Sequence, residues 1–331
     1  MAYFQKGLDG SGTVEDPFLV RSYTDYVSID ARYNVSDDPP YYKLENDLNM
    51  AANGGYMMEK DFYNGHLNMN DHSIISPKVS IGKYLIKNCD IYSNEMEVVG
   101  GDGKVRTKGG CGQILDIRGG LMDYGFNACT FRRMFIDINA EGMFIGNVSP
   151  QTGLISRARG EQSHFRINNV GYIYKLVTSY NPGSEGDYPF VDCCFEFNGE
   201  AYDINSTSLI DFGYSDPNVT DPMLNRCLIT GKLDCSNLSY AYGSCPYPLV
   251  KGKVSDSAFY LYGNDERDQK GYGGYADTID SSTVTIALDV SDSKMYIKNQ
   301  NGVSMVSAQN YINPTYLKSI DFDVININKE G

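Results

Sequence analysis

Short stretches of alternating apolar and polar residues recur along most of the chain, which is the pattern of half-buried β-strands. Three early segments show this pattern: 41–50, 62–75 and 84–92. Between residues 30 and 265, no stretch keeps an apolar period of about 3.6 residues over roughly 11 residues or more, so we expect no long helix there. The pattern therefore predicts an all-β fold built from short strands and turns.

The two ends of the chain differ from the middle. Near the start, a Gly-rich turn leads into a short strand at residues 18–20, and Ser22 is placed to N-cap a short amphipathic turn that ends at Ile29. After residue 277, segments 283–290 and 320–327 alternate in a way that suits an antiparallel terminal piece. We therefore expect three parts: an N-terminal cap (1–30), a repeat region (31–277) and a C-terminal β cap or assembly segment (278–331).

A six-residue frame recurs in the repeat region: an apolar residue, two mostly polar residues, a small residue, any residue and a second apolar residue. The frame occurs at residues 86–91, 126–131, 167–172, 190–195, 224–229 and 254–259. Its small fourth residues are Cys89, Cys129, Val170, Cys193, Cys227 and Ser257. In a parallel β-solenoid a unit can bury its inner face only against its neighbours, so we expect these six residues to stack as one inward ladder. The unequal steps between the frames fit units with loops of different length.

Four motifs in the first 90 or so residues carry a resemblance. They are Gly-x-Gly-Thr-x-x-Asp-Pro-Phe-x-Val at 10–20, Tyr-Lys-Leu-x-x-Asp-Leu at 42–48, Phe-x-x-Gly-x-Leu-x-x-Asn-x-His-x-Ile at 62–74 and Leu-Ile-Lys-Asn-Cys-x-Ile at 85–91. Together they resemble the start of right-handed parallel β-helix proteins of bacterial surfaces and of bacteriophage tail appendages, fibres and spikes. The resemblance implies a right-handed parallel β-helix with a short N-terminal cap and a strand-rich C-terminal segment.

Charge and composition narrow the classes of partner. Lys and Arg total 28 against 42 Asp and Glu, a formal net charge of −14, and so acidic a surface repels nucleic acid. No apolar run is long enough for a membrane span, and the first residues lack the apolar core of a signal peptide, so neither membrane insertion nor export by the usual route is expected. The eight cysteines include no Cys-x-x-Cys pair, and we expect them to be reduced.

Known catalytic and cofactor motifs are absent from the sequence, so we expect no catalytic residue, no cofactor and no metal. The densest group of charged residues is the polar patch Arg157, Arg159, Glu161, His164 and Arg166, in which the first three would share one strand face. A solvated face or a strip of salt bridges between subunits is the plainer interpretation of this patch. Catalysis or ligand binding is the alternative.

Tyrosines are crowded in a Gly-rich region near the end of the repeats. Four of them are candidates for contact with a protein interface or a glycan: Tyr260, Tyr262, Tyr272 and Tyr275. Amphipathic aromatic residues are favoured at protein interfaces and against sugar faces, although ordinary turn packing would also account for them.

These observations favour a structural component of a bacteriophage particle, located in the virion as a tail appendage, fibre or head-associated spike. Its expected partners are other virion proteins, two further copies of the chain in a homotrimer, and a glycan of the host surface. The alternatives are a glycan-degrading enzyme on the same fold, like a tailspike depolymerase, and a bacterial surface adhesin.

Overall fold

The computed structural model describes about half of the chain in detail. The described residues are 7–30, 39–53, 60–79, 84–99, 105–109, 112–119, 125–139, 144–145, 155–168, 172–173, 177–178, 190–200, 210–211, 224–234, 250–262, 264–265, 276–279, 285–288, 294–295 and 304–307. Nearly all of their regular elements are strands, and most of these strands belong to two large parallel sheets.

The first sheet, sheet A, contains 13 strands. They are β1 (Phe18–Val20), β2 (Tyr41–Leu44), β4 (Lys60–Asn68), β7 (Ile86–Tyr92), β11 (Phe126–Arg132), β14 (Ile155–Ser156), β15 (Arg159–Glu161), β18 (Val177–Thr178), β19 (Phe190–Val191), β21 (Ile210–Asp211), β22 (Leu224–Asn225), β24 (Val250–Ser255) and β27 (Ala276–Ile279).

The second sheet, sheet B, contains 11 strands. They are β3 (Leu48–Asn49), β5 (Ser73–Ile75), β6 (Lys78–Val79), β10 (Gly112–Gly119), β12 (Met134–Asn139), β16 (His164–Asn168), β20 (Cys194–Glu200), β23 (Leu228–Asp234), β25 (Ala258–Tyr262), β28 (Thr285–Leu288) and β30 (Ser304–Ser307).

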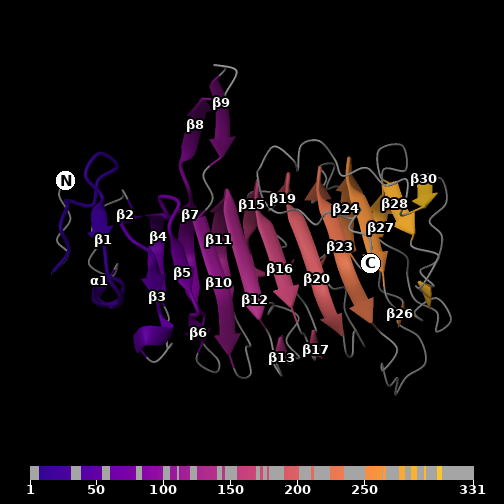
Figure 1. Cartoon of the computed structure of the whole chain (residues 1–331), viewed down its shortest axis with the longest axis horizontal. Helices are drawn as coiled ribbons and strands as arrows, with labels where there is room; N and C mark the ends of the chain where they lie inside the picture. The colour runs from indigo at the N-terminus through magenta and orange to yellow at the C-terminus, as the bar shows by residue number, and fades with distance from the viewer. Residues whose placement is uncertain are drawn as a thin grey trace.

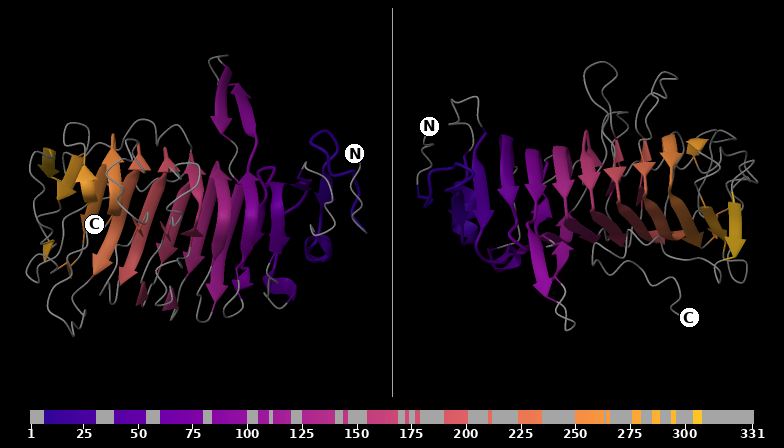
Figure 2. Two further views of the ribbon diagram at one scale, coloured as in Figure 1. Left: turned by 180° about the vertical axis from the view of Figure 1, so that it is seen from behind. Right: turned by 90° about the horizontal axis from the view of Figure 1, so that it is seen from above.

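The chain passes alternately through the two sheets, and each passage through sheet A and then sheet B forms one unit. Strands of successive units pair in parallel, so β7 lies beside β11, and β12 lies beside β16. Figure 1 shows these strands side by side along the long axis, from β1 at one end to β30 at the other, and Figure 2 shows the two layers from above. The all-β prediction is confirmed for the described residues.

The core fills the space between the two layers. Phe165 of sheet B packs edge-on against Phe131 and Phe190 of sheet A, with ring centroids 5.3 and 5.8 Å apart, and stacks on Phe195 at 5.2 Å. All four rings are fully buried. Aromatic pairs in these geometries add to the stability that burial of their apolar area provides.

The N-terminal prediction is confirmed in its elements. Helix α1 (Tyr23–Ser28) begins at Ser22, whose side chain accepts a hydrogen bond from the backbone N–H of Asp25. Lys60 then fixes the other end of α1, because its Nζ donates to the carbonyls of Val27 and Ile29 at 2.6 and 2.9 Å. A cation at a helix C-terminus satisfies carbonyls that have no partner within the helix.

The expectation of an antiparallel C-terminal piece is wrong where the structure describes it. Strand β28 lies within segment 283–290 and pairs in parallel with β25 and with β30. Alternation of apolar residues indicates one buried face, but it carries no information about the direction of the neighbouring strand. The segment 320–327 lies outside the described residues.

Candidate functional site

The corners between the sheets are the first feature that the recurring frame encodes. Each corner between β11, β15, β19, β22 or β24 and the sheet B strand that follows contains one residue with positive φ, between 48° and 55°. These residues are Arg133, Gln162, Asp192, Arg226 and Asp256. The backbone N–H of each of the first four donates to a carbonyl of the next unit, over 3.1 to 3.3 Å. These bonds offset the cost of the left-handed conformation, which is about 1 kcal/mol or more for a residue with a Cβ.

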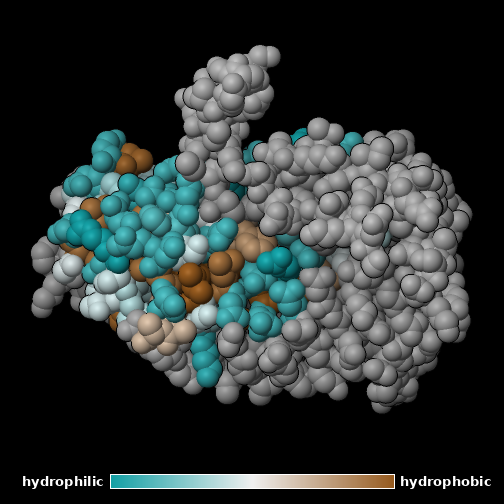
Figure 3. Space-filling view, viewed as in Figure 1, coloured by the Kyte–Doolittle hydropathy of each residue, from teal (hydrophilic) through white to brown (hydrophobic). Residues whose placement is uncertain are grey.

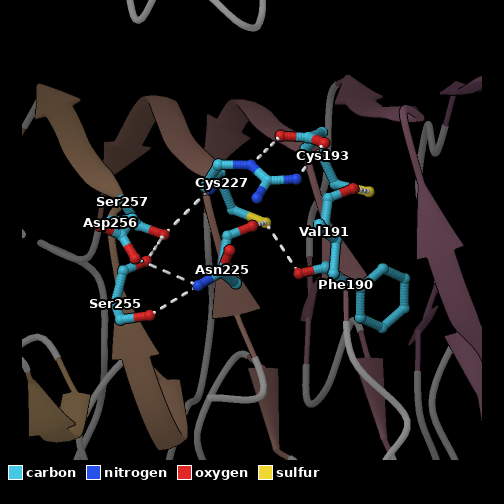
Figure 4. A network of polar contacts seen from close by, with 10 residues as sticks. Phe190, Val191, Cys193, Asn225, Cys227, Ser255, Asp256 and Ser257 are labelled. Carbon is cyan, nitrogen blue, oxygen red and sulfur yellow. Dashed lines mark hydrogen bonds and ion pairs between the residues drawn. The ribbon is translucent and has the colours of Figure 1, made fainter. Parts of the chain in front are cut away.

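A small residue follows each of the last four of these corner residues, and its side chain bonds back across the turn. Cys193 Sγ lies 3.3 Å from the carbonyl oxygen of Val191, and Cys227 Sγ lies 3.4 Å from that of Asn225. Ser257 makes the same contact to Ser255 at 2.6 Å. Cysteine here takes the role of serine, with the thiol donating to the carbonyl two residues earlier. Figure 4 shows this network around Cys227, which also donates to Phe190.

The prediction of one ladder of six small residues is wrong, because the frame marks two different corners. Cys89 and Cys129 are register partners at an earlier turn within sheet A, after Asn88 and Ala128, which also have positive φ. The residues Cys193, Cys227 and Ser257 belong instead to the corner between the sheets. Both corners need a left-handed residue followed by a small one, so their local sequences look alike.

The third frame, 167–172, belongs to neither ladder. Ile167 lies in sheet B and pairs with Ile138 and Phe197, and Val170 lies outside the described residues. The true member at this level is Ser163, whose Oγ donates to the carbonyl of Glu161 at 2.9 Å. Sequence analysis missed Ser163 because Gly160 stands where the frame has an apolar residue.

All five cysteines in the described part of the chain are free thiols and buried: Cys89, Cys129, Cys193, Cys194 and Cys227. Burial raises the pKa of Cys129 to about 12 and raises the pKa values of Cys89 and Cys193 as well. A thiol acts as a nucleophile or metal ligand in its deprotonated form, so these cysteines are suited to packing. Cys111, Cys235 and Cys245 lie outside the described residues.

The structure divides the predicted polar patch between the two sheets. Arg159 and Glu161 are exposed in β15 on sheet A, and Arg157 is the left-handed residue just before that strand. His164 and Arg166 lie beyond the corner in β16 on sheet B. The five residues therefore do not form one site, although period-two spacing holds for Arg159 and Glu161.

His164 instead belongs to a buried polar pair. Its Nε2 lies 2.9 Å from Oε2 of Glu196 on β20, and the two residues are 1% and 4% exposed. Arg166, two residues further along β16, donates from Nε to Oδ1 of Asp137 at 3.0 Å and lies 4.7 Å over the ring of Phe135. Alternate residues of these strands, such as Phe165, fill the core, so the polar pair lies on the outer face of sheet B.

Parallel register places five residues, among them Arg166 and Glu196, in one row across the outer face of sheet B. Each of the following residues is the register partner of the next: Asp137, Arg166, Glu196, Thr230 and Tyr260. The row thus joins Arg166 and Tyr260 of the sequence-based candidates to three residues that sequence analysis missed. Alternation predicts an outward position for each of them, but only the register of sheet B shows that they are neighbours.

The other three tyrosine candidates are not brought into this row. Tyr262 is the last residue of β25, and its side chain is not described, whereas Tyr272 and Tyr275 lie outside the described residues.

Two carboxylates of the row, Asp137 and Glu196, are two strands apart. A strand spacing of about 4.8 Å places their Cα atoms about 10 Å apart, and side chains on one face at this spacing can bring two carboxyl groups to the roughly 6.5–9.5 Å found in inverting glycosidases. Glu196, however, is buried, and Asp137 accepts hydrogen bonds from Arg166 and Asn168. In this conformation Glu196 is closed to a substrate, whereas the Asp137 side chain is 17% exposed.

The outer face of sheet A carries a second polar cluster near the N-terminal end. The rings of Tyr41 and His66 stack with centroids 4.2 Å apart, and Nδ1 of His66 lies 3.1 Å from Oδ2 of Asp90. Arg132 also bonds to Asp90 and lies over the ring of Tyr92. On the face drawn in Figure 3, the described surface is mostly hydrophilic and surrounds a smaller apolar patch.

The described residues hold neither a metal-binding cluster nor a membrane-spanning helix. The described residues contain no group of three or more His, Cys, Asp or Glu residues arranged to hold a metal ion. Within the same part of the chain, no helix has both the length and the apolar character that a membrane span requires. No protein-family model, curated protein or solved structure matches the chain.

Proposed function

We propose that the chain folds as a right-handed parallel β-helix and serves as a structural component of a bacteriophage particle. The proposed location is the virion, in a tail appendage, a fibre or a head-associated spike. The proposed partners are other virion proteins, further copies of the chain in a homotrimer and a glycan of the host surface.

The observation that carries this proposal is the parallel pairing of successive units in both sheets around one apolar core. Successive units are joined by strand pairing and, in the middle of the described chain, also by corner hydrogen bonds and by contacts between aromatic rings. Such an arrangement is stiff along its axis and grows in length by adding units. A long, stiff body is what a fibre or spike requires.

Polar side chains at and beside the corners between the sheets also join neighbouring units along this axis. Arg226 donates from Nε and Nη2 to the two carboxylate oxygens of Asp192, each over 2.6 Å. Asn225 in turn donates to the side chains of Ser255 and Asp256 in the next unit. Polar side chains therefore tie neighbouring units together on the surface, as core residues do inside.

Mass spectrometry of purified phage particles tests the proposal. The particles should come from the phage or prophage whose genome encodes this chain, with a lysate of the uninfected or uninduced host as the control. We expect the chain in the particles at a constant ratio to the major capsid protein. Its absence from particles that contain their full set of tail proteins would contradict the proposal.

A glycan-degrading enzyme is the second candidate, and the separation of Asp137 and Glu196 is the observation that favours it. Incubation with host capsular or cell-wall polysaccharide, followed by assay of reducing ends, tests it. Turnover that is lost in both Asp137→Asn and Glu196→Gln, while both variants remain folded at the assay temperature, would establish the enzyme. The absence of turnover from the unchanged chain would leave the structural role alone.

A further inference from the structure

The β8–β9 hairpin differs from every other described part of the fold. Strands β8 (Glu95–Val99) and β9 (Val105–Gly109) pair antiparallel and form a two-stranded sheet of their own. Figures 1 and 2 show the pair projecting from the body formed by the two large sheets. All other strand pairs among the described residues are parallel.

The hairpin is inserted at a corner between the two sheets, and the next unit crosses the same corner with far fewer residues. After β11 the chain reaches sheet B through Arg133 alone. After β7 it runs through the hairpin before it enters sheet B at Gly112. Both ends of the insertion are held in the body, because the N–H of Ser93 donates to the carbonyl of Arg132 and the N–H of Gly112 donates to that of Arg133. The body is therefore complete at this corner without the hairpin.

Register separates the charges of the hairpin onto its two faces. Met96 is opposite Lys108 and Val98 is opposite Arg106, so these four positions share one face, which is basic and apolar. The other face holds the positions of Glu95, Glu97, Val99, Val105 and Thr107, and it is acidic and apolar. No position on either face is directly opposite one of unlike charge. The hairpin therefore presents two complementary faces rather than one neutralised surface.

An isolated two-stranded hairpin is at best marginally stable in water, and its outer edges present unpaired backbone groups. Within the described residues, neither β8 nor β9 pairs with any other strand. We propose that the β8–β9 hairpin is an assembly arm that packs against the same hairpin of a second copy, with the Arg106 and Lys108 face of one copy on the Glu95 and Glu97 face of the next. The inference rests on the homo-oligomer in the proposed function and names its contact surface.

Charge also selects the symmetry of this contact. A two-fold contact brings identical faces together, which would place Arg106 and Lys108 against their own copies, or Glu95 and Glu97 against theirs. A head-to-tail contact instead joins unlike faces; it forms a ring when the rotation from copy to copy closes and an open filament when it does not, and the proposed homotrimer is the closed case. The net charge of −14 makes copies of the chain repel one another, and a local contact between unlike charges would offset that repulsion.

Light scattering on four forms of the full chain tests the arm. The double variant Arg106→Glu/Lys108→Glu makes both faces acidic, and Glu95→Lys/Glu97→Lys makes both basic. The quadruple variant combines them and exchanges the two faces. We expect the unchanged chain and the quadruple variant to form the same ring at 10 μM. The dissociation constant of each double variant should be at least tenfold higher. Rescue by the quadruple variant excludes misfolding as the cause.

Replacement of residues 93–111 by a single Asn, which copies the one-residue corner at Arg133, gives a second readout. This variant should keep the unfolding midpoint of the body and scatter as a monomer. If it assembles as the unchanged chain does, the arm is not the contact, whereas the virion role stands or falls separately with mass spectrometry of the particles. A monomeric unchanged chain at 10 μM, or double variants that assemble normally, would also overturn the inference.

Discussion

The ring of Phe190 lies directly over Gly160 of the preceding unit, where a Cβ atom would stand 2.4 Å from Phe190 Cδ1. Gly160 occupies the register position that Phe131 fills one unit earlier. A large inward residue at Phe190 is therefore matched by the loss of one at Gly160. The Phe190 ring fills the space that a side chain at Gly160 would occupy.

This relationship predicts that Gly160→Ala destabilises the chain. The added methyl group must displace the Phe190 ring, and overpacking of this kind costs about 1–3 kcal/mol. The urea midpoint of unfolding should fall accordingly. In the double variant Gly160→Ala/Phe190→Leu the smaller side chain leaves room for the methyl group, so the cost of Gly160→Ala should shrink when it is measured in the Phe190→Leu background. Equal costs in both backgrounds would mean that the two residues do not share this space.

The corner cysteines should accept serine but not a large residue. Cys227→Ser keeps a donor for the carbonyl of Asn225, as Ser257 shows at the next corner, and should lower the free energy of unfolding by less than about 1 kcal/mol. Cys227→Phe should cost about 1–3 kcal/mol through overpacking. Chemical unfolding monitored by circular dichroism compares the two. A serine variant as damaged as the phenylalanine variant would contradict the shared role of serine and cysteine.

Part of this architecture follows from the sequence alone. Alternation predicted the strands, and the Ser22 cap predicted α1, because both depend on residues close together in the chain. The recurring frame predicted a single inward ladder and not the left-handed corners at which five of its six occurrences lie; it merged two corners of one unit, since each makes the same local demand. The row from Asp137 to Tyr260 depends on the register between distant strands, which no local pattern contains.

Raised thiol and phenol pKa values make the fold sensitive to alkali. Burial raises the pKa of Cys129 from 9.0 to about 12, and it raises the pKa values of Tyr26 and Tyr42. Above pH 9 the unfolded chain loses protons that the folded chain retains, so stability is full below pH 9 and falls between pH 9 and 12. The melting temperature should follow this course. The Cys129→Ser variant should show a shallower decline, and an unchanged decline would exclude the thiol as a contributor.

The buried pair on sheet B predicts unequal effects of two substitutions. Glu196→Ala removes the partner of a buried His164 and should cost about 3 kcal/mol. Glu196→Gln keeps an oxygen at hydrogen-bond distance from His164 and should cost less. Thermal unfolding of both variants at pH 7 measures the difference. Two variants of equal stability would show that the contact with His164 contributes nothing.

The stacking of the units is the central claim, and pulsed electron paramagnetic resonance tests it most directly. One row on sheet A runs by register through Lys43, Asn68, Tyr92, Arg132, Glu161, Val191 and Asn225. At about 4.8 Å per strand, Cα atoms four and six strands apart along this row are about 19 and 29 Å apart.

Spin labels should be placed at Lys43 and Glu161 in one variant and at Lys43 and Asn225 in another. Cys111, Cys235 and Cys245 should be replaced by serine, and the labelled chain diluted with unlabelled chain. The account predicts narrow distance distributions in which the second separation exceeds the first by about 10 Å, the rise of two strands. Equal separations, or a second separation shorter than the first, would contradict the stacked parallel arrangement.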